Sequence, residues 1–397
     1  MSKLSDRILN LSDSQTLAMA QRSRDLKEKG VDVINLSIGE PDFGTPQCIK
    51  DAGKKAIDDN YSHYSPVPGF NELRKAIVEK FRKENNLEYD FNEIIVSNGA
   101  KQSLANVLLS LVNKGEEVII PTPYWVSYIE LVKLAEGVPI LLEACIDNDF
   151  KITPKQIEQA ISAKTKAIML NSPSNPTGSV YSQEEMEEIA EVLKKYPDII
   201  IISDEIYEHI NYVGKHFSIA QIDGMKERTA VINGVSKAYA MTGWRIGYMA
   251  APIWLAKACN KLQGQTTSGA NSVAQIAAIE ALESGMEESN RMREAFHNRR
   301  DLVMSMLDEI PGITRNVPSA AFYIFPNIEG ILGKSYGKYL ILSDMDLAMY
   351  LLETAHVAIV PGSAFGSANC IRISFAASEK ELIEAFTRMH QAISLLE

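Results

Sequence analysis

The chain has 397 residues, of which 46% are hydrophobic and 23% are charged, so it can bury a large core in more than one domain. Its formal net charge of -11 argues against a nucleic acid or an anionic membrane surface as the main partner. No apolar run reaches membrane-spanning length and the N-terminus lacks signal-peptide form, so we expect a cytoplasmic protein that does not bind membranes.

The residues that commonly bind metals or form disulfides are scattered along the chain. The four cysteines are far apart and form no CxxC pair, and the six histidines show no HExxH spacing. We therefore expect reduced thiols and no metal site.

In chain order, the segment from Glu93 to Ala251 alternates short apolar runs with amphipathic stretches. The runs EIIVS, EVII, VPILL, KAIML, IIII and TAVI predict strands, and residues 100–115 have helical spacing. Ser182 with Glu185 forms a capping-box pattern, and Thr153 before Pro154 predicts another helix start. This alternation predicts an α/β fold, with a large, mostly parallel (mixed) sheet covered by helices on both faces.

The C-terminal part has a different pattern. A charged helical stretch over about 287–309 leads into AAFYIFP, further mixed strand and helix patterns, and a final helix, which together predict a smaller α+β domain. We expect residues 46–290 to form the large, cofactor-binding domain. Residues 291–397 would form the small domain, and residues 1–45 would pack with it.

Polar residues follow five of the predicted strands. Since ligands bind at the carboxyl ends of parallel strands, we expect one edge to collect these segments: Asn98–Lys101, Tyr124–Trp125, Asn171–Gly178, Asp204–Tyr207 and Asn233–Lys237. Singly, each has a plain explanation, such as a helix cap, a core residue or a turn. Together they offer an amine, a carboxylate, a hydroxyl, an amide, a flat ring and a Gly-led helix start, a set that suits pyridoxal phosphate.

Lys237 lies between the apolar runs of "VINGVSKAYAMTGWRIGY". A buried, unpartnered ammonium is costly, so either its end reaches water or the amine is a nucleophile with a depressed pKa that forms an imine with a carbonyl cofactor.

The sequences SPSNPTG, SDEIYEHI, SKAYAMTGWRIGY and IRISFA resemble the motifs of class I aminotransferases of the fold type I pyridoxal-phosphate family. LSIGEPDFGTP and GAKQSL are similar to the bacterial aspartate aminotransferase branch, and the likeness covers nearly the whole chain. The resemblance implies that Lys237 forms a Schiff base with pyridoxal 5'-phosphate and moves the proton. It also implies that Asp204 pairs with the ring nitrogen, Tyr207 and Asn175 bond the ring oxygen, and Trp125 stacks on the ring.

The resemblance also implies a phosphate site made by Gly99, Ala100, Ser236 and Arg245. Ala100 stands where relatives often have a hydroxyl residue, so the phosphate would depend there on backbone N–H groups. Tyr64 is similar to a tyrosine that reaches the neighbouring subunit's phosphate, which implies a homodimer with shared sites. The alternative is that Tyr64 only packs.

For the substrate, the resemblance implies that Arg372 clamps the α-carboxylate through a bidentate fork, helped by Gly39 and Asn175. Trp125 would contact the substrate as well as the ring. We also expect the Asn175–Pro176 peptide bond to be cis.

Lys101 stands at a predicted helix start, where a positive charge is unfavourable. It either points to solvent, adds charge to the cofactor phosphate, or binds the distal carboxylate of a dicarboxylic substrate, as the resemblance implies.

The implied reaction is amino transfer from an L-amino acid, with aspartate first, to a 2-oxo acid, with 2-oxoglutarate first. Alternatives of the same fold are a prephenate, alanine or aromatic aminotransferase, or a lyase. A ligand-sensing regulator is a further alternative, but such proteins usually carry an added DNA-binding domain, for which we expect no room before the motifs begin.

Overall fold

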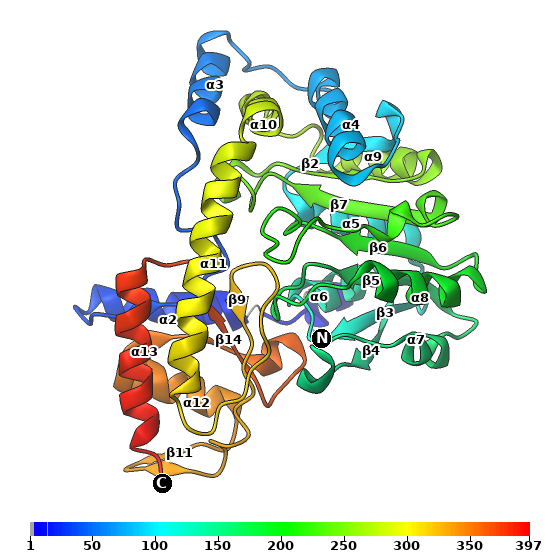
Figure 1. Ribbon diagram of the computed structural model, residues 1–397. Coiled ribbons are helices and arrows are strands. Elements are labelled where there is room, and N and C mark those ends of the chain that lie inside the picture. The colour runs from blue at the N-terminus through cyan, green and yellow to red at the C-terminus, as the bar shows by residue number, and fades with distance from the viewer. Residues whose placement is uncertain (1–3, 14) are drawn as a thin grey trace.

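The computed structural model describes residues 4–13 and 15–397. Within these residues a seven-stranded sheet forms the centre of the larger part of the molecule (Figure 1). Its spatial order is β2-β8-β7-β6-β5-β3-β4, and its strands are β2 (Ile94–Ser97), β3 (Glu117–Thr122), β4 (Val138–Glu143), β5 (Thr165–Asn171), β6 (Ile200–Asp204), β7 (Thr229–Gly234) and β8 (Gly247–Ala250).

The strand directions place the carboxyl ends of β2 to β7 at one edge of the sheet. Strands β3 to β7 pair in parallel, whereas β8 lies antiparallel between β2 and β7. Both predictions, a mostly parallel mixed sheet and one shared edge for the five polar segments, are confirmed. The antiparallel placement of β8 was not among the sequence expectations.

Helices cover both faces of this sheet because successive strand residues point to opposite sides. Val118 and Ile120 belong to a core with α5 (Ala100–Leu111), α6 (Ser127–Leu134) and α9 (Ile253–Thr266), whereas Ile119 packs in a second core with α7 (Pro154–Ala160) and α8 (Gln183–Lys194). A third core joins β2, β7 and β8 to α3 (Gln47–Asp58), α4 (Asn71–Asn85) and α10 (Ser272–Ser284).

The N- and C-terminal segments share a fourth core. Strand β1 (Ile34–Asn35) pairs in parallel with β12 (Val357–Ala358), which joins residues more than 300 positions apart. A small antiparallel sheet has the order β13 (Val360–Pro361), β14 (Ile371–Ser374) and β9 (Tyr323–Ile324). Helices α12 (Asp344–Tyr350) and α13 (Glu379–Ser394) pack here, and β10 (Ser335–Tyr336) and β11 (Tyr339–Leu340) form a hairpin.

Helix α11 (Met286–Asp308) runs from beside α10 to beside α13 and links the two parts (Figure 1). The predicted domain boundary at 290/291 falls inside this continuous helix. The pairing of β1 with β12 supports packing of the N-terminal segment with the small domain, but the domain limits remain a prediction.

Local sequence signals account for several element ends. The capping box at Ser182 and the helix start at Thr153 before Pro154 are both formed, as predicted. Thr153 also forms a capping box with Gln156. Helix α5 ends at Leu111, earlier than the expected Gly115, because Val112 already adopts an extended backbone.

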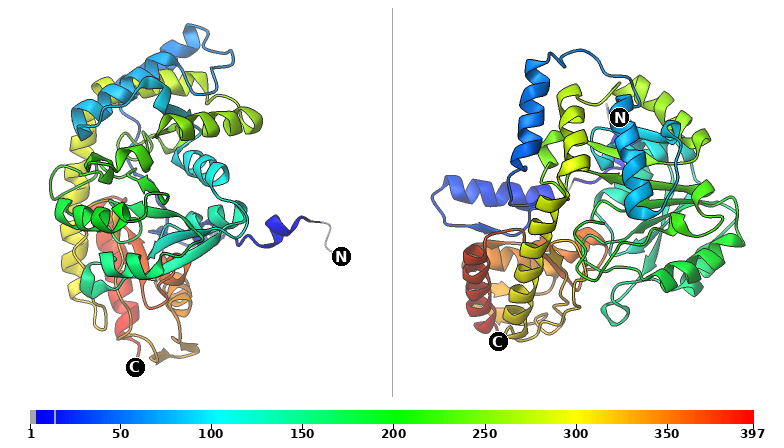
Figure 2. Two further views of the ribbon diagram at one scale, coloured as in Figure 1. Left: turned by 90° about the vertical axis from the view of Figure 1, so that its right-hand side faces the viewer. Right: turned by 45° about the horizontal axis from the view of Figure 1, so that its top comes forward.

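The N-terminal helices α1 (Asp6–Leu9) and α2 (Gln15–Glu28) differ in position. Figure 2 shows α1 beyond the body of the molecule in its left view, whereas α2 packs on the small part. Among the described residues, no helix is both long and apolar enough to cross a bilayer.

Candidate active site

A cavity of about 450 Å³ opens at the carboxyl edge of the sheet, between the large and small parts. Eleven of the thirteen predicted site residues line it: Gly39, Ala100, Lys101, Trp125, Asn175, Asp204, Tyr207, Ser236, Lys237, Arg245 and Arg372. A twelfth, Gly99, is the residue that precedes α5 at the cavity wall. The sequence reasoning therefore located one site from residues spread over more than 330 positions.

Lys237 follows β7 and directs its amine into the cavity. Its Nζ donates a hydrogen bond to the Gly39 carbonyl oxygen at 2.6 Å. Burial lowers the pKa of Lys237 to about 8, and the Arg372 and Arg245 charges act in the same direction, against the nearby carboxylates. The lowered pKa increases the neutral fraction of the amine, which suits a nucleophile. The bond to Gly39 and the position in the cavity wall show that the partly buried side chain does not simply extend into bulk water.

Asp204 is the last residue of β6 and is 4% exposed. Tyr128 Oη donates to its Oδ2 at 2.7 Å, and the Ile206 N–H donates to Oδ1 at 3.3 Å. Burial raises the pKa of Asp204 to about 6, although Tyr128 and Lys237 favour the carboxylate. The site thus holds a carboxylate that gains from any further positive charge placed against it.

Tyr207 lies one turn after Asp204 and is 3% exposed. Its hydroxyl is 2.9 Å from that of Tyr323, which comes from β9 in the small part. Burial, followed by the contact with Tyr323, raises the pKa of Tyr207 well above its ordinary value. The hydroxyl therefore stays protonated and can donate a hydrogen bond in the cavity.

Arg372, on β14, reaches the cavity from the small part and is 2% exposed. Its Nη1 donates to Asn175 Oδ1 at 3.1 Å and its Nη2 to the Ser37 carbonyl at 2.7 Å. The guanidinium lies 4.5 Å from the Tyr323 ring centroid. Its buried Nε has no partner among the described residues, so the group keeps a donor for a carboxylate.

Asn175 is held by a tight turn after β5. The Asn171 side chain accepts from the Asn175 N–H at 2.8 Å and donates to the Asp204 carbonyl at 2.9 Å. The Asn175–Pro176 peptide bond is cis, as predicted. The Asn175 side chain lies against Arg372, whose Nη1 donates to its Oδ1.

The start of α5 forms a cradle for an anion. Gly99 has φ +83°, and a Cβ there would lie 2.3 Å from Arg245 Nη2. Arg245 is itself held by the carbonyls of Thr242 and Asn98 at 2.9 and 3.2 Å. The backbone N–H groups at the start of α5, which has 12 residues, the Arg245 guanidinium and the nearby Ser236 together suit a phosphate group.

Trp125 and Lys101 form the wall nearest to solvent. The Trp125 ring meets Tyr128 edge-on, and Lys101 Nζ lies 4.9 Å from the Trp125 ring centroid. Lys101 is exposed, yet its pKa is lowered, first by partial desolvation of the amine and then by the charge of Arg245. Lys101 and the buried Arg372 thus supply two cations to the lining of one cavity.

Tyr64, the thirteenth predicted residue, does not line this cavity within the single chain. Its side chain is fully exposed beside residues 269–273. Its predicted contact with a neighbouring subunit stays a prediction.

Sequence reasoning missed several lining residues. Tyr128 and Tyr323 bond directly to predicted site residues, and Asn171 fixes the Asn175 turn. Tyr128 could have been noticed because it lies only three residues after Trp125, at the start of α6. Thr16 and Leu17 come from the N-terminal helix and carried no local signal.

The chain matches the family described as aminotransferase class I and II over residues 31–389. This protein is a member of that family. It is 47% identical to an aspartate/prephenate aminotransferase of Cereibacter sphaeroides, with 98% of each chain covered, and 43% identical to an aspartate aminotransferase of Pinus pinaster, covering 99% of this chain and 81% of the relative.

Solved structures of the family have the same fold. An aspartate aminotransferase of Rhizobium meliloti has a TM-score of 0.96 at 44% identity, with both chains fully covered. A Thermus thermophilus aspartate aminotransferase with maleate has a TM-score of 0.92 at 39% identity, covering 99% of this chain and 100% of that one. The aminotransferase fold, fold type I, is therefore established for the chain.

The buried Asp204 of this aminotransferase should destabilise the cofactor-free fold. Its pKa is raised from 3.8 to about 6, so ionisation is harder in the folded than in the unfolded chain. The resulting loss in the free energy of unfolding is absent below about pH 4, where Asp204 is protonated in both states. It grows as the pH rises and reaches roughly 3 kcal/mol above pH 6. We predict that Asp204→Asn raises the melting temperature of the cofactor-free protein at pH 8, and that the gain disappears near pH 4.

The exposed Asp223 provides a matched control, because Asp223→Asn removes the same charge without relieving burial. Thermal unfolding of both variants across pH measures the difference. An Asp204→Asn variant that is no more stable than wild type at pH 8 would contradict the assigned cost of burial.

Proposed function

We propose that this aminotransferase uses pyridoxal 5'-phosphate to move the amino group of a dicarboxylic L-amino acid, with aspartate first, to a 2-oxo acid such as 2-oxoglutarate. The observation that carries the proposal is the cavity in which the lowered-pKa amine of Lys237 lies with Asp204 and Arg372. An amine, a buried carboxylate and a carboxylate-binding guanidinium are the groups that this chemistry requires.

The residues present fit this cofactor. When bound, pyridoxal phosphate supplies an aldehyde for an amine and a ring that withdraws electrons. Asp204 would hold the ring nitrogen protonated, and Tyr207 and Asn175 would donate to the ring oxygen. Trp125 would cover the ring face, while the phosphate would lie in the cradle described above, formed by Gly99, Ala100, Ser236 and Arg245.

Separate residues of the chain would carry out proton transfer and substrate binding. Lys237, whose pKa of about 8 keeps part of the amine neutral, would remove the proton from the substrate Cα and return it to the cofactor side. Arg372 would hold the α-carboxylate, using its unpartnered Nε and the Nη atoms that now contact Asn175 and Ser37. Gly39 would border the same substrate group.

The preference for a dicarboxylic substrate rests on two cations that line the cavity. Arg372 is buried, whereas Lys101 is exposed. The Thermus thermophilus relative was solved with maleate, a dicarboxylate, and the curated relatives include several aspartate aminotransferases. An added role of Lys101 at the phosphate remains compatible with its position beside Arg245.

Prephenate is a second candidate acceptor. The Cereibacter sphaeroides relative, 47% identical, is named for both aspartate and prephenate. Prephenate also carries two carboxylates, spaced as in 2-oxoglutarate, with a ring built on the carbon that bears the second one. The apolar Leu17 and Trp125 side chains line the cavity and could pack against such a ring.

We also propose a cytoplasmic homodimer with shared active sites. Tyr64 is fully exposed, and Ile57 and Tyr61 nearby are exposed to 64% and 38%. An apolar surface of this kind is suited to burial against a second subunit, from which Tyr64 could reach the partner's phosphate cradle.

Replacing Lys237 tests the proposal. We predict that Lys237→Ala folds and still binds the cofactor, but loses the Schiff-base absorption and nearly all turnover. The readout is the visible spectrum of the loaded protein and the release of 2-oxo acid from aspartate without an acceptor. Lys261→Ala, an exposed lysine on α9, is the control. Normal transamination by Lys237→Ala would reject the assigned nucleophile.

Replacing Lys101 tests substrate choice. Losing a partly desolvated charge-assisted contact should cost roughly 2–4 kcal/mol, or about thirty- to a thousandfold in kcat/KM. We predict this loss for aspartate and glutamate with Lys101→Ala, and a much smaller loss for alanine and phenylalanine. Equal losses for all four amino acids would assign Lys101 to the phosphate or the fold instead.

A further inference from the structure

A buried polar cluster lies behind the turn that carries Asp204 and Tyr207. It consists of Lys80, Asn85, Glu208 and Asn233, called here the Glu208 cluster, and each residue is at most 5% exposed. None of them lines the cavity. The turn from Asp204 to Glu208 thus presents Asp204 and Tyr207 to the cavity and Glu208 to this cluster.

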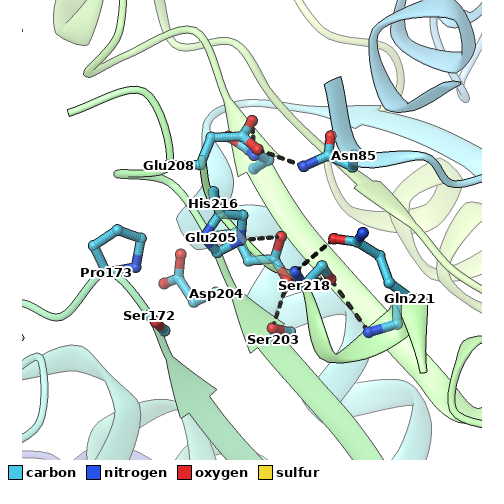
Figure 3. Close-up of polar contacts among 12 residues, drawn as sticks. Asn85, Ser172, Pro173, Ser203, Asp204, Glu205, Glu208, His216, Ser218 and Gln221 are labelled. Carbon is cyan, nitrogen blue, oxygen red and sulfur yellow. Dashed lines mark hydrogen bonds and ion pairs between the residues drawn. The ribbon is translucent and has the colours of Figure 1, made fainter. Parts of the chain in front are cut away.

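Both carboxylate oxygens of Glu208 accept hydrogen bonds from buried side chains. Oε1 accepts from Asn233 Nδ2 at 2.7 Å and from Lys80 Nζ in a short contact, while Oε2 accepts from Asn85 Nδ2 at 2.8 Å. Lys80 also donates to Asn85 Oδ1 at 2.8 Å, which closes the cluster. Figure 3 shows Glu208 and Asn85 facing one another above the β6 strand end.

Glu205 anchors the other side of the same turn. Its Oε1 accepts from the hydroxyls of Ser203 and Ser218 at 2.7 and 2.6 Å, and its Oε2 lies 2.8 Å from His216 Nε2. Figure 3 shows these partners on one side of the strand and Asp204 directed to the other side, near Ser172 and Pro173.

The charges in this region compensate one another. Burial opposes ionisation of Glu208, but Lys80 together with His209 and His216 outweighs it and holds the pKa of Glu208 below its ordinary value. Burial likewise opposes protonation of His216, yet Glu205 and Glu208 raise its pKa. Glu205, Glu208 and His216 lie close enough together to hold a cation, but Lys80 already supplies one to Glu208.

Stability alone does not explain a buried ion pair. A well-packed apolar pair of similar volume is often as stable or more stable, because the desolvation of two charges is avoided. A fully satisfied polar cluster instead fixes one geometry, since any displacement leaves a buried charge without its partner. The Glu208 cluster is therefore suited to holding segments in register.

The segments that it joins are those that carry the reacting groups. Glu208 directly follows Tyr207. Asn233, at the end of β7, also accepts from the Gly234 N–H at 2.7 Å, and the chain then continues to Ser236 and Lys237. Helix α4 supplies Lys80 and Asn85 as a fixed support from outside the site.

We propose that Glu208 is a positioning residue, which holds the Tyr207 turn and the β7 end together and so sets the Tyr207 hydroxyl and the Lys237 amine at their working separation. The inference rests on the proposed function, because it assigns a purpose to the separation of those two groups. Lys80 and Asn85 fix the Glu208 carboxylate. Asn233 connects that carboxylate to the end of β7, from which the chain continues to Lys237.

A displacement of about 1 Å in reacting groups can lower a rate by about a hundredfold without removing any contact to substrate. We therefore expect Glu208→Gln, which keeps the volume but leaves Lys80 with only the Glu84 carboxylate, 3.6 Å away, to lower kcat for aspartate by ten- to a hundredfold. KM should stay within about twofold, because Arg372 and Lys101 are untouched.

The control is Arg228→Met, at the opposite edge of the sheet. Arg228 is also a buried cation, 8% exposed, and it donates to the carbonyls of Leu193, Tyr196 and Ile199. Its loss should destabilise the protein without displacing the site. Both variants are assayed as loaded enzyme, well below their melting temperatures.

A second readout is independent of turnover. The pH midpoint of the visible absorption change of the bound cofactor reports the setting of the Lys237 and Tyr207 groups around it. We expect this midpoint to move in Glu208→Gln and to stay at the wild-type value in Arg228→Met. Glu208→Asp, which restores the charge on a shorter side chain, should recover part of kcat.

If Glu208→Gln does not fold, Asn233→Ala keeps the experiment decisive. It removes the bond to Glu208 and the bond from the Gly234 N–H but leaves the Lys80–Glu208 pair intact. It should show the same fall in kcat and the same type of spectral shift. A wild-type kcat and midpoint in whichever of these variants folds would overturn the positioning role, as would equal changes in Arg228→Met. A wild-type protein that neither binds the cofactor nor transaminates would reject the proposed function itself.

Discussion

The site depends on confining positive charge in a largely buried cavity. Lys237 shares the cavity with Arg372 and Arg245, and the combined effect of burial and these charges lowers its pKa to about 8. An amine so placed is readily deprotonated, and a carbonyl that bonds it would remove the remaining cost of its charge. Asp204 faces the converse problem, since burial raises its pKa to about 6 and a cationic partner would relieve the cost.

The large sheet and the small part of the molecule each contribute some of the residues that line the cavity. The large sheet brings Asp204, Lys237 and the anion cradle to one edge, because strands β2 to β7 end there. The small part contributes Arg372 and Tyr323, which meet Asn175 and Tyr207 across the cavity. Arg372 and Lys237 are thus held by separate elements, and their separation depends on how those elements pack.

Strand ends could be read from the sequence because apolar runs and the polar residues after them are local features. Asp204, Lys237 and Asn175 were predicted in this way together with the family motifs. The orientation of β8 and the roles of Tyr128 and Tyr323 were not predicted, because each depends on which residue a distant element brings opposite. The Glu208 cluster was missed for the same reason, since Lys80 precedes Glu208 by 128 residues and no local pattern links them.

The central claim is that Lys237, among all the lysines of the chain, provides the amine to the cofactor. Reduction of the loaded protein with borohydride, followed by digestion and mass spectrometry of the peptides, tests it most directly. The account predicts one pyridoxyl group per chain, on the peptide that contains Lys237. A label on Lys101 or on surface lysines, with an unmodified Lys237 peptide, would contradict it.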